Sequence, residues 1–176
     1  MLLHKIKNAC VKLLRTLAMP AAIFLVVTVL ARTVFLFALV PTGSMHPTLD
    51  EPCYVVSNRL AFRKAGPQRG DIVLFTRATE DKTIYAKRIV GLPGETLEIV
   101  DGVTYIDGTP LEESYLAEPA ESLDFGPFTI PEDSYFLMGD NRNHSYDSRY
   151  WEEHFVPESN VLSEILFALH IPGGDF

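Results

Sequence analysis

Residues 83–90 read Thr83-Ile84-Tyr85-Ala86-Lys87-Arg88-Ile89-Val90, a run in which β-branched and aromatic residues surround a lysine. This composition predicts a β-strand. A lysine in a short apolar strand usually faces solvent or blunts a sheet edge. If the lysine is buried instead, its charged form becomes costly, its pKa falls, and it can accept a proton. We expect Ile84, Ala86 and Ile89 to exclude water from Lys87, and no carboxylate to pair with it.

A candidate partner for this lysine lies upstream, in Pro41-Thr42-Gly43-Ser44-Met45-His46-Pro47-Thr48-Leu49. Most serines in such a setting are turn residues. A serine hydroxyl is a weak nucleophile at its ordinary pKa and needs an adjacent proton acceptor. Gly43 lets the backbone turn sharply and lets a substrate strand approach. Ser44 and Lys87 together therefore suggest a nucleophile and its general base.

Four blocks follow one another along the chain: Pro41 to Leu49, Gly70-Asp71-Ile72-Val73, Lys87 to Glu95, and Gly139 to Trp151. In this order they resemble the bacterial type I signal peptidase (leader peptidase) family, the membrane-bound Ser/Lys endopeptidases that remove signal peptides from exported proteins. The resemblance runs from the apolar N-terminal segment to about Pro157. It implies a mainly β chain, in which a signal-peptidase-like antiparallel β-sheet catalytic domain follows one N-terminal transmembrane helix.

The resemblance also implies a role for single residues. Ser44 would attack the scissile carbonyl, and Lys87 would take its proton and later activate the deacylating water. The oxyanion would be bound by the backbone N–H of Ser44 and the hydroxyl of Thr42. The hydroxyl of Ser145 would hold Lys87 in position. Structural residues near the site would be the ion pair of Asp147 and Arg149, with Asp140 and Arg142 in the same signature. The family's chemistry needs neither a cofactor nor a metal.

Substrate recognition in the family implies β-augmentation, with the signal-peptide segment before the cut lying extended beside the nucleophile. Shallow apolar pockets would accept small residues one and three positions before the cut, the A-x-A pattern. The candidates for these pockets are Pro41, Met45, Leu49, Tyr85 and Ala86. Ordinary core packing is the alternative for each of them.

The N-terminal segment predicts a membrane anchor. Thr16 to Ala31 is uncharged and mostly apolar, and the run resumes after Arg32 up to Val40. A spanning helix needs about 20 apolar residues, so the span should end between Arg32 and Val40. Basic residues before the span place the N-terminus in the cytoplasm. A cleaved signal peptide has the same outline, but no A-x-A-like site follows the run.

We therefore expect a cytoplasmic N-terminus at residues 1–15 and a transmembrane anchor with a membrane-proximal segment at 16–40. An extracytoplasmic catalytic domain should follow at 41–176, on a bacterial cytoplasmic (inner) membrane. Six short strands are predicted, at 54–56, 72–75, 84–90, 96–100, 103–106 and 135–138, with a small β excursion at about 101–130. Leu111 to Asp124 looks like a surface segment, and Val161 to Ile171 a final strand or docked helix.

The uneven distribution of charged residues limits the classes of partner that the chain can bind. Of the 15 Lys and Arg residues, five lie in residues 1–32, which contain no acid, so residues 33–176 carry ten basic against all 23 acidic side chains. A nucleic-acid partner is excluded because phosphate contacts need a basic face. The expected partners are the bilayer and the signal peptides of exported preproteins, near the secretion translocon. Cys10 and Cys53 should remain unpaired thiols on opposite sides of the membrane.

Other functions compete with this interpretation. A histidine base is disfavoured: His46 is only two residues from Ser44, which leaves His144 and His154 as the distant alternatives. Residues 140–145 resemble a calcium loop only superficially. A specialised relative processing a dedicated substrate such as a pilin, or a non-catalytic anchored β-rich binding protein, remains open. Glu152-Glu153-His154 departs from the family pattern, which puts the geometry after Trp151 in question.

Overall fold

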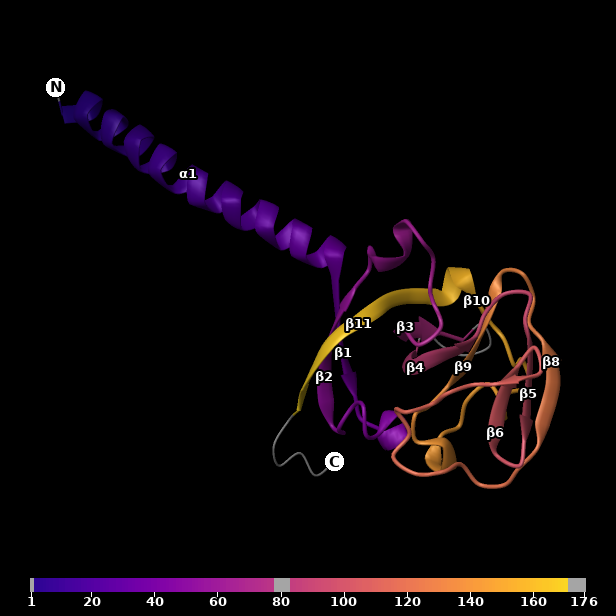
Figure 1. The fold of residues 1–176 in the computed structure, drawn as a ribbon. Helices are drawn as coiled ribbons and strands as arrows, with labels where there is room; N and C mark the ends of the chain where they lie inside the picture. Colours follow the sequence, from indigo (N-terminus) through magenta and orange to yellow (C-terminus); the bar gives the residue numbers. More distant parts are fainter. Residues whose placement is uncertain (1, 78–82, 171–176) are drawn as a thin grey trace. The chain divides into compact units, whose positions relative to one another are not determined.

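The computed structural model describes residues 2–77 and 83–170 (Figure 1). The chain divides into two units, Met1–Phe35 and Leu36–Phe176. The first unit is α1, Leu2–Val34, with Pro20 in its interior. Its segment Arg15–Val34 has 20 residues with a mean hydropathy of 2.1, and none of it is buried. By length and composition this helix can cross a membrane.

The helix ends earlier than the apolar sequence does. Residues Phe35–Val40 form strand β1, which pairs with β2, Cys53–Asn58. The apolar residues Phe35 to Val40, which follow Arg32, therefore form a strand of the sheet. Sequence alone left the end of the span between Arg32 and Val40, and the structure ends the helix at Val34.

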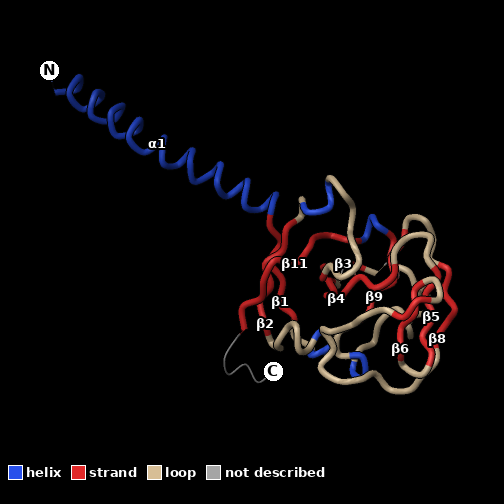
Figure 2. Tube along the Cα trace, viewed as in Figure 1, coloured by secondary structure: helices blue, strands red, loops and turns tan. Residues whose placement is uncertain are grey.

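The second unit is built from two antiparallel sheets (Figure 2). The larger has the order β1-β2-β11-β3-β4-β9-β10. Its remaining strands are β3 (Ile72–Thr76), β4 (Ile84–Gly91), β9 (Ser134–Met138), β10 (Val156–Pro157) and β11 (Val161–His170). Figure 1 shows the long β11 in yellow, and its residues pair with both β2 and β3. The C-terminal segment up to His170 is thus a strand, and Ile171 lies outside the described residues.

The smaller sheet has the order β7-β6-β5-β8. It contains β5 (Thr96–Val100), β6 (Val103–Ile106), β7 (Thr109–Pro110) and β8 (Phe125–Thr129). Asp101 and Gly102 close the β5–β6 hairpin with positive φ angles of 50° and 80°. This sheet overlaps the predicted β excursion at about 101–130, but its first strand begins earlier, at Thr96. The predicted class, a mainly antiparallel β domain after one apolar helix, is confirmed.

Both faces of the central strands β3 and β9 are covered, and most of β4 is buried, which explains their strongly apolar sequences. In β3, Leu74 belongs to one buried cluster with Met45 and Val55, whereas Val73 and Phe75 belong to a second. This separation follows from the alternation of side chains along a strand. A third cluster, including Val90, Leu97 and Phe136, joins residues of the two sheets. β4 lies between β3 and β9, and Lys87, which pairs with Val73 of β3, directly precedes the part of β4 that pairs with β9.

Gly91 allows the two sheets to approach each other. A Cβ atom at this position would lie 2.3 Å from Ile130 Cδ1 and 3.0 Å from Phe136 Cβ. We therefore expect Gly91→Ala to destabilise the domain by about 1–3 kcal/mol, the usual cost of overpacking a core. Urea unfolding of the wild type and the variant measures the difference.

The companion variant Gly91→Ala/Ile130→Val tests the cause, because valine lacks the nearest atom, Cδ1. It should recover part of the lost stability. Equal stability of Gly91→Ala and wild type would show that the sheets have room for the methyl group.

Candidate active site

Ser44 and Lys87 meet at the surface of the larger sheet. Ser44 is the middle residue of a short 3₁₀ turn, Gly43–Met45, which follows Thr42 in an extended conformation. Lys87 projects from β4 and is 4% exposed. Its Nζ lies 2.5 Å from Ser44 Oγ and is hydrogen-bonded to it. The two residues that the sequence paired thus lie within proton-transfer distance.

The environment of Lys87 favours its neutral form. Burial lowers the pKa of Lys87 from 10.5 to about 8, with a smaller contribution of the same sign from Arg149. Asp147 and Asp140 oppose the shift through space, and no carboxylate among the described residues forms an ion pair with the lysine. Because the folded state disfavours the ammonium, the lysine costs stability progressively as pH falls from 10.5 to about 8, and fully below that.

The apolar neighbours of Lys87 differ in part from those expected. Val73 pairs directly with Lys87 across β3 and β4. Ile89, which was expected, lies on the same face of β4, and both Val73 and Ile89 are fully buried. Ile84 and Ala86 lie on the opposite face because side chains alternate along a strand. Both residues nevertheless line the cavity that Ser44 and Lys87 also line, so their contribution to excluding water stays a prediction, and Ala86 packs in the cluster of Met45 and Leu74.

The turn that carries Ser44 is held by the loop Gly139 to Arg149, referred to below as loop 139–149. The backbone N–H of Asn141 donates to Ser44 O at 3.1 Å, and Asn141 Nδ2 donates to Gly43 O at 3.0 Å. Gly139 is required at this junction, since a Cβ there would lie 2.3 Å from Ser44 O. The sequence reading did not single out Asn141, although its place between Asp140 and Arg142 was the available signal.

Ser145 does not make the contact expected of it. Its Oγ is buried without a hydrogen-bond partner among the described residues. The side chain lies beside Gly139, where an added Cβ would be 2.2 Å from Ser145 Oγ. The structure therefore brings Ser145 to the site, but the expected hydrogen bond to Lys87 is not formed.

The charged residues of loop 139–149 are buried and paired. Asp147 and Arg149 form the expected ion pair, with Arg149 Nε 2.8 Å from Asp147 Oδ1. Asp147 also accepts a hydrogen bond from the backbone N–H of Gly139 at 3.0 Å. This pair fixes the loop beside Lys87.

Asp140 and Arg142 are each paired, but not with one another. Asp140 accepts two hydrogen bonds from Arg88, at 2.7 and 2.6 Å, and one from the Thr48 hydroxyl at 2.5 Å. Arg142 donates to both carboxylate oxygens of Glu113, at 2.7 and 2.5 Å. Their true partners are distant in sequence, so spacing gave no indication of them.

A cavity of about 170 Å³ opens beside the Ser44–Lys87 pair. It is lined by Thr42 and by three of the predicted pocket residues, Pro41, Tyr85 and Ala86. The walls also include residues that the sequence did not indicate, namely Ala38, Leu39, Val40, Leu74, Thr83 and Ile84. Met45 and Leu49 are 0% and 4% exposed and pack in the core. Their assignment as substrate pockets is therefore wrong, because the turn directs them into the domain.

The three histidines considered as alternative bases have other partners. His46 lies 3.6 Å from Asp50, His144 contacts Asn141 Oδ1 at 3.2 Å, and His154 contacts Ser148 O at 2.7 Å. Among the described residues no group of His, Cys, Asp and Glu could hold a metal ion. The local arrangement is therefore that of a serine–lysine pair.

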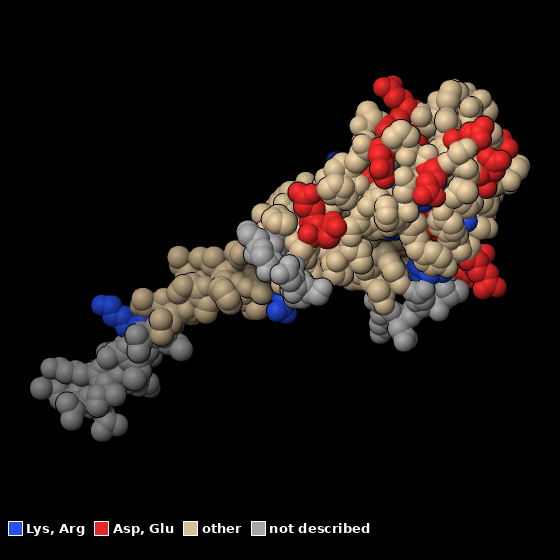
Figure 3. Space-filling model, turned by 90° about the horizontal axis from the view of Figure 1, so that it is seen from below, with Lys and Arg blue, Asp and Glu red and all other residues tan. Residues whose placement is uncertain are grey.

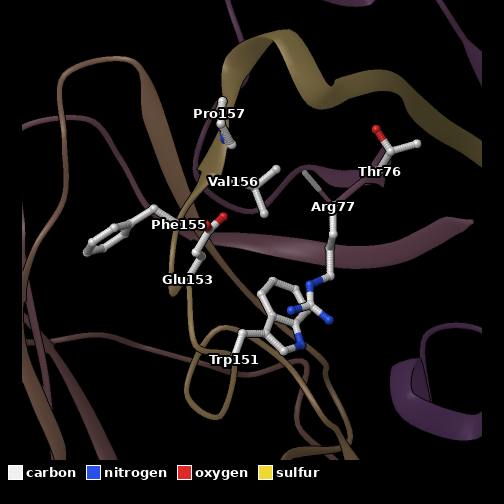
Figure 4. Close-up of a pocket in the computed structure, with 7 residues that line it drawn as sticks. All are labelled: Thr76, Arg77, Trp151, Glu153, Phe155, Val156 and Pro157. Carbon is white, nitrogen blue, oxygen red and sulfur yellow. The ribbon is translucent and has the colours of Figure 1, made fainter. Parts of the chain in front are cut away.

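In the segment after Trp151, Glu152 and Glu153 are exposed, whereas His154 and Phe155 are half-buried. His154 packs against Phe128 with the two rings tilted by 51° and their centroids 4.5 Å apart. A hollow close by, shown in Figure 4, lies where Arg77 covers the ring of Trp151 at 4.7 Å. Its volume of about 10 Å³ is room for one water molecule at most. We assign no ligand to it.

Comparison with known proteins agrees with this geometry. A family model described as "Signal peptidase, peptidase S26" matches residues 13–169. A "Probable signal peptidase I-2" of Synechocystis sp. is 40% identical over 128 residues, which cover 70% of this chain and 57% of that protein. "Signal peptidase I" of Leptolyngbya laminosa is 38% identical over 130 residues, which cover 70% of this chain and 63% of that protein. The match thus spans less than two thirds of the length of either relative.

A crystal structure of a signal peptidase I from Enterococcus faecalis V583 has 38% sequence identity to this chain and a TM-score of 0.49. The match covers 57% of this chain and 97% of that one. The family assignment rests on the family model, which extends over nearly the whole chain from within α1 to the end of β11. The chain belongs to the signal peptidase family, peptidase S26.

Proposed function

We propose that this protein is a membrane-anchored serine endopeptidase that cleaves signal peptides from exported proteins after small residues. The observation that carries the proposal is the bond between Lys87 Nζ and Ser44 Oγ, at 2.5 Å, made by a buried lysine with a lowered pKa. A lysine that titrates near 8 supplies a substantial neutral fraction at working pH. Such a base activates a serine that would otherwise be inert.

In the first half of the reaction, neutral Lys87 accepts the proton of Ser44 Oγ while Oγ bonds to the scissile carbonyl carbon. The oxyanion receives hydrogen bonds from the Ser44 N–H and the Thr42 hydroxyl; both residues line the cavity. When the C–N bond breaks, the Lys87 ammonium returns the proton to the leaving amine. Water then gives a proton to Lys87 and attacks the ester, and Ser44 leaves with that proton restored.

The strands around the cavity support an extended substrate. β4 pairs with β9 only through Arg88 to Gly91, so the edge of Ile84 to Lys87 on that side is unpaired by β9. β1 is the terminal strand of the sheet, and its residues Ala38 to Val40 form the other wall. A peptide that enters as an added strand can lie beside the backbone of these two strands. The small, apolar cavity suits the small side chains of an A-x-A segment.

The same proposal includes the membrane. Residues 1–15 lie in the cytoplasm, the remaining part of α1 spans a bacterial inner membrane, and the β domain faces outward near the secretion translocon. The apolar segment Arg15–Val34 and the basic residues before it support this topology. Figure 3 shows acidic side chains spread over one face of the β domain, which supports a protein substrate over a nucleic acid.

The first test of the function is removal of either member of the pair. Ser44→Ala and Lys87→Met should each lower kcat on an A-x-A preprotein by about 10³-fold or more, because the two act as one unit. Exposed Ser114→Ala and Lys64→Ala serve as matched controls and should keep wild-type activity. Cleavage in detergent, followed on gels, measures this. Turnover near wild type by Ser44→Ala would rule out the assignment.

The pH dependence identifies the base. Activity requires neutral Lys87, so kcat/KM on a soluble signal-peptide substrate should rise with pH through about 8 and then level off. The acidic limb should persist when all five histidines are replaced by alanine. Loss of the limb on replacing any one histidine would instead identify that residue as the base.

Topology is tested by protease digestion of right-side-out spheroplasts. The outward-facing domain should be digested, leaving a fragment that contains α1, because the basic N-terminal flank retains residues 1–15 inside. A cytoplasmic marker protein should stay intact in the same sample. Protection of the β domain until the cells are lysed would contradict the proposed orientation.

A further inference from the structure

We propose that Glu113 and Tyr115 are positioning residues for Ser44, acting through loop 139–149. Both lie between β7 and β8, in the segment that the sequence suggested was only a surface excursion. The inference rests on the proposed function, because its effect is defined for the reaction of Ser44. The contacts link these two residues to the nucleophile in three steps.

The first step is the neutralisation of Arg142. Its side chain is 3% exposed and that of Glu113 is 8% exposed, and the two form a two-pronged ion pair. Arg142 also donates to Gly139 O at 3.2 Å and to Thr104 Oγ1 at 3.2 Å. Burial raises the pKa of Glu113, but the bonds and charge of Arg142 outweigh this and lower it overall. Glu113 is therefore an anion that compensates a buried cation.

The second step connects Tyr115 to two arginines near the site, Arg142 and Arg88. The Tyr115 hydroxyl donates to Glu113 Oε1 at 2.7 Å and accepts a bond from Arg142 Nη2 at 3.3 Å. The guanidinium of Arg88 lies over the Tyr115 ring at 4.0 Å. Arg88 directly follows Lys87 and binds Asp140 with two hydrogen bonds. Tyr115 thus contacts both Arg88, which binds Asp140, and Arg142, which follows Asn141 in the chain.

The third step reaches the nucleophile. Asn141 lies between these two anchored residues, Asp140 and Arg142, and makes two hydrogen bonds to the turn of Ser44. If Glu113 loses its charge, Arg142 becomes a buried cation without a full partner, and its 3₁₀ turn, Arg142–His144, must shift. Asn141 would then no longer hold the Ser44 turn in register with Lys87. Displacements of about 1 Å can cost on the order of 10²-fold in rate.

The test compares Glu113→Gln and Tyr115→Phe with the control Glu112→Gln, in which the adjacent, exposed carboxylate is removed. We expect Glu113→Gln to lower kcat at least about tenfold and Tyr115→Phe about threefold, with KM changed less than about twofold. The reason is that neither side chain lines the substrate cavity. Glu112→Gln should match wild type. All assays are run well below the measured Tm of each variant.

A double-mutant cycle with Asn141→Ala separates positioning from a general loss of stability. If Glu113 acts through Asn141, the loss of kcat in the double variant should be smaller than the product of the two single losses, because Asn141→Ala already removes the bond from Nδ2 to Gly43 O. Multiplicative losses would overturn the inference, as would wild-type kcat in a folded Glu113→Gln. If Glu113→Gln does not fold, Tyr115→Phe, which deletes one hydroxyl, decides in the same cycle, and an unchanged kcat then overturns the inference.

The wild type distinguishes this inference from the proposed function. If the wild type fails to cleave an A-x-A preprotein, the proposed function fails, and the inference with it. If the wild type cleaves and the variants equal it, only the positioning role of Glu113 and Tyr115 is wrong.

Discussion

The burial of Lys87 is the constraint on which the rest of the site depends. A lysine inside a sheet costs free energy, and here that cost appears as the pKa lowered from 10.5 to about 8. The sheet accommodates it because Val73 and Ile89 are fully buried beside the side chain and Ser44 Oγ accepts its one short contact. The same burial that weakens the folded state makes the amine a usable base at moderate pH.

A neutral Lys87 can accept the proton of Ser44 only if the two side chains stay within hydrogen-bonding distance. Loop 139–149 keeps the Ser44 turn in this position. Three ion pairs surround it: Asp140 with Arg88, Arg142 with Glu113, and Asp147 with Arg149. Buried pairs of this kind contribute little net stability, whereas removal of one partner costs about 3–5 kcal/mol. Their role here is to fix one conformation, in which Asn141 donates hydrogen bonds to two backbone carbonyls of the turn that carries Ser44.

The small sheet contributes to the site from outside the larger one. It packs through the cluster of Leu97, Ile99 and Phe136, and Gly91 permits the close approach. The segment between β7 and β8 contains Glu113 and Tyr115, which both bind Arg142 of loop 139–149. The small sheet and the segment between β7 and β8 are therefore part of the structure that surrounds the Ser44–Lys87 pair.

The sequence by itself determined the class of the chain, the strands near the site and the chemical pair. Local composition was sufficient for the strands, because apolar runs with Asp-Gly turns predict them. The Ser44–Lys87 pair was predicted from the order of four blocks that resembles the signal peptidase family. Only the tertiary structure decided which side chains face each other. It turned Met45 and Leu49 into the core, assigned Ile84 and Ala86 to the face away from Lys87, and paired Arg142 with Glu113. The physical reason is that face, register and ion-pair partners depend on contacts between residues far apart in the chain, which periodicity within one strand does not encode.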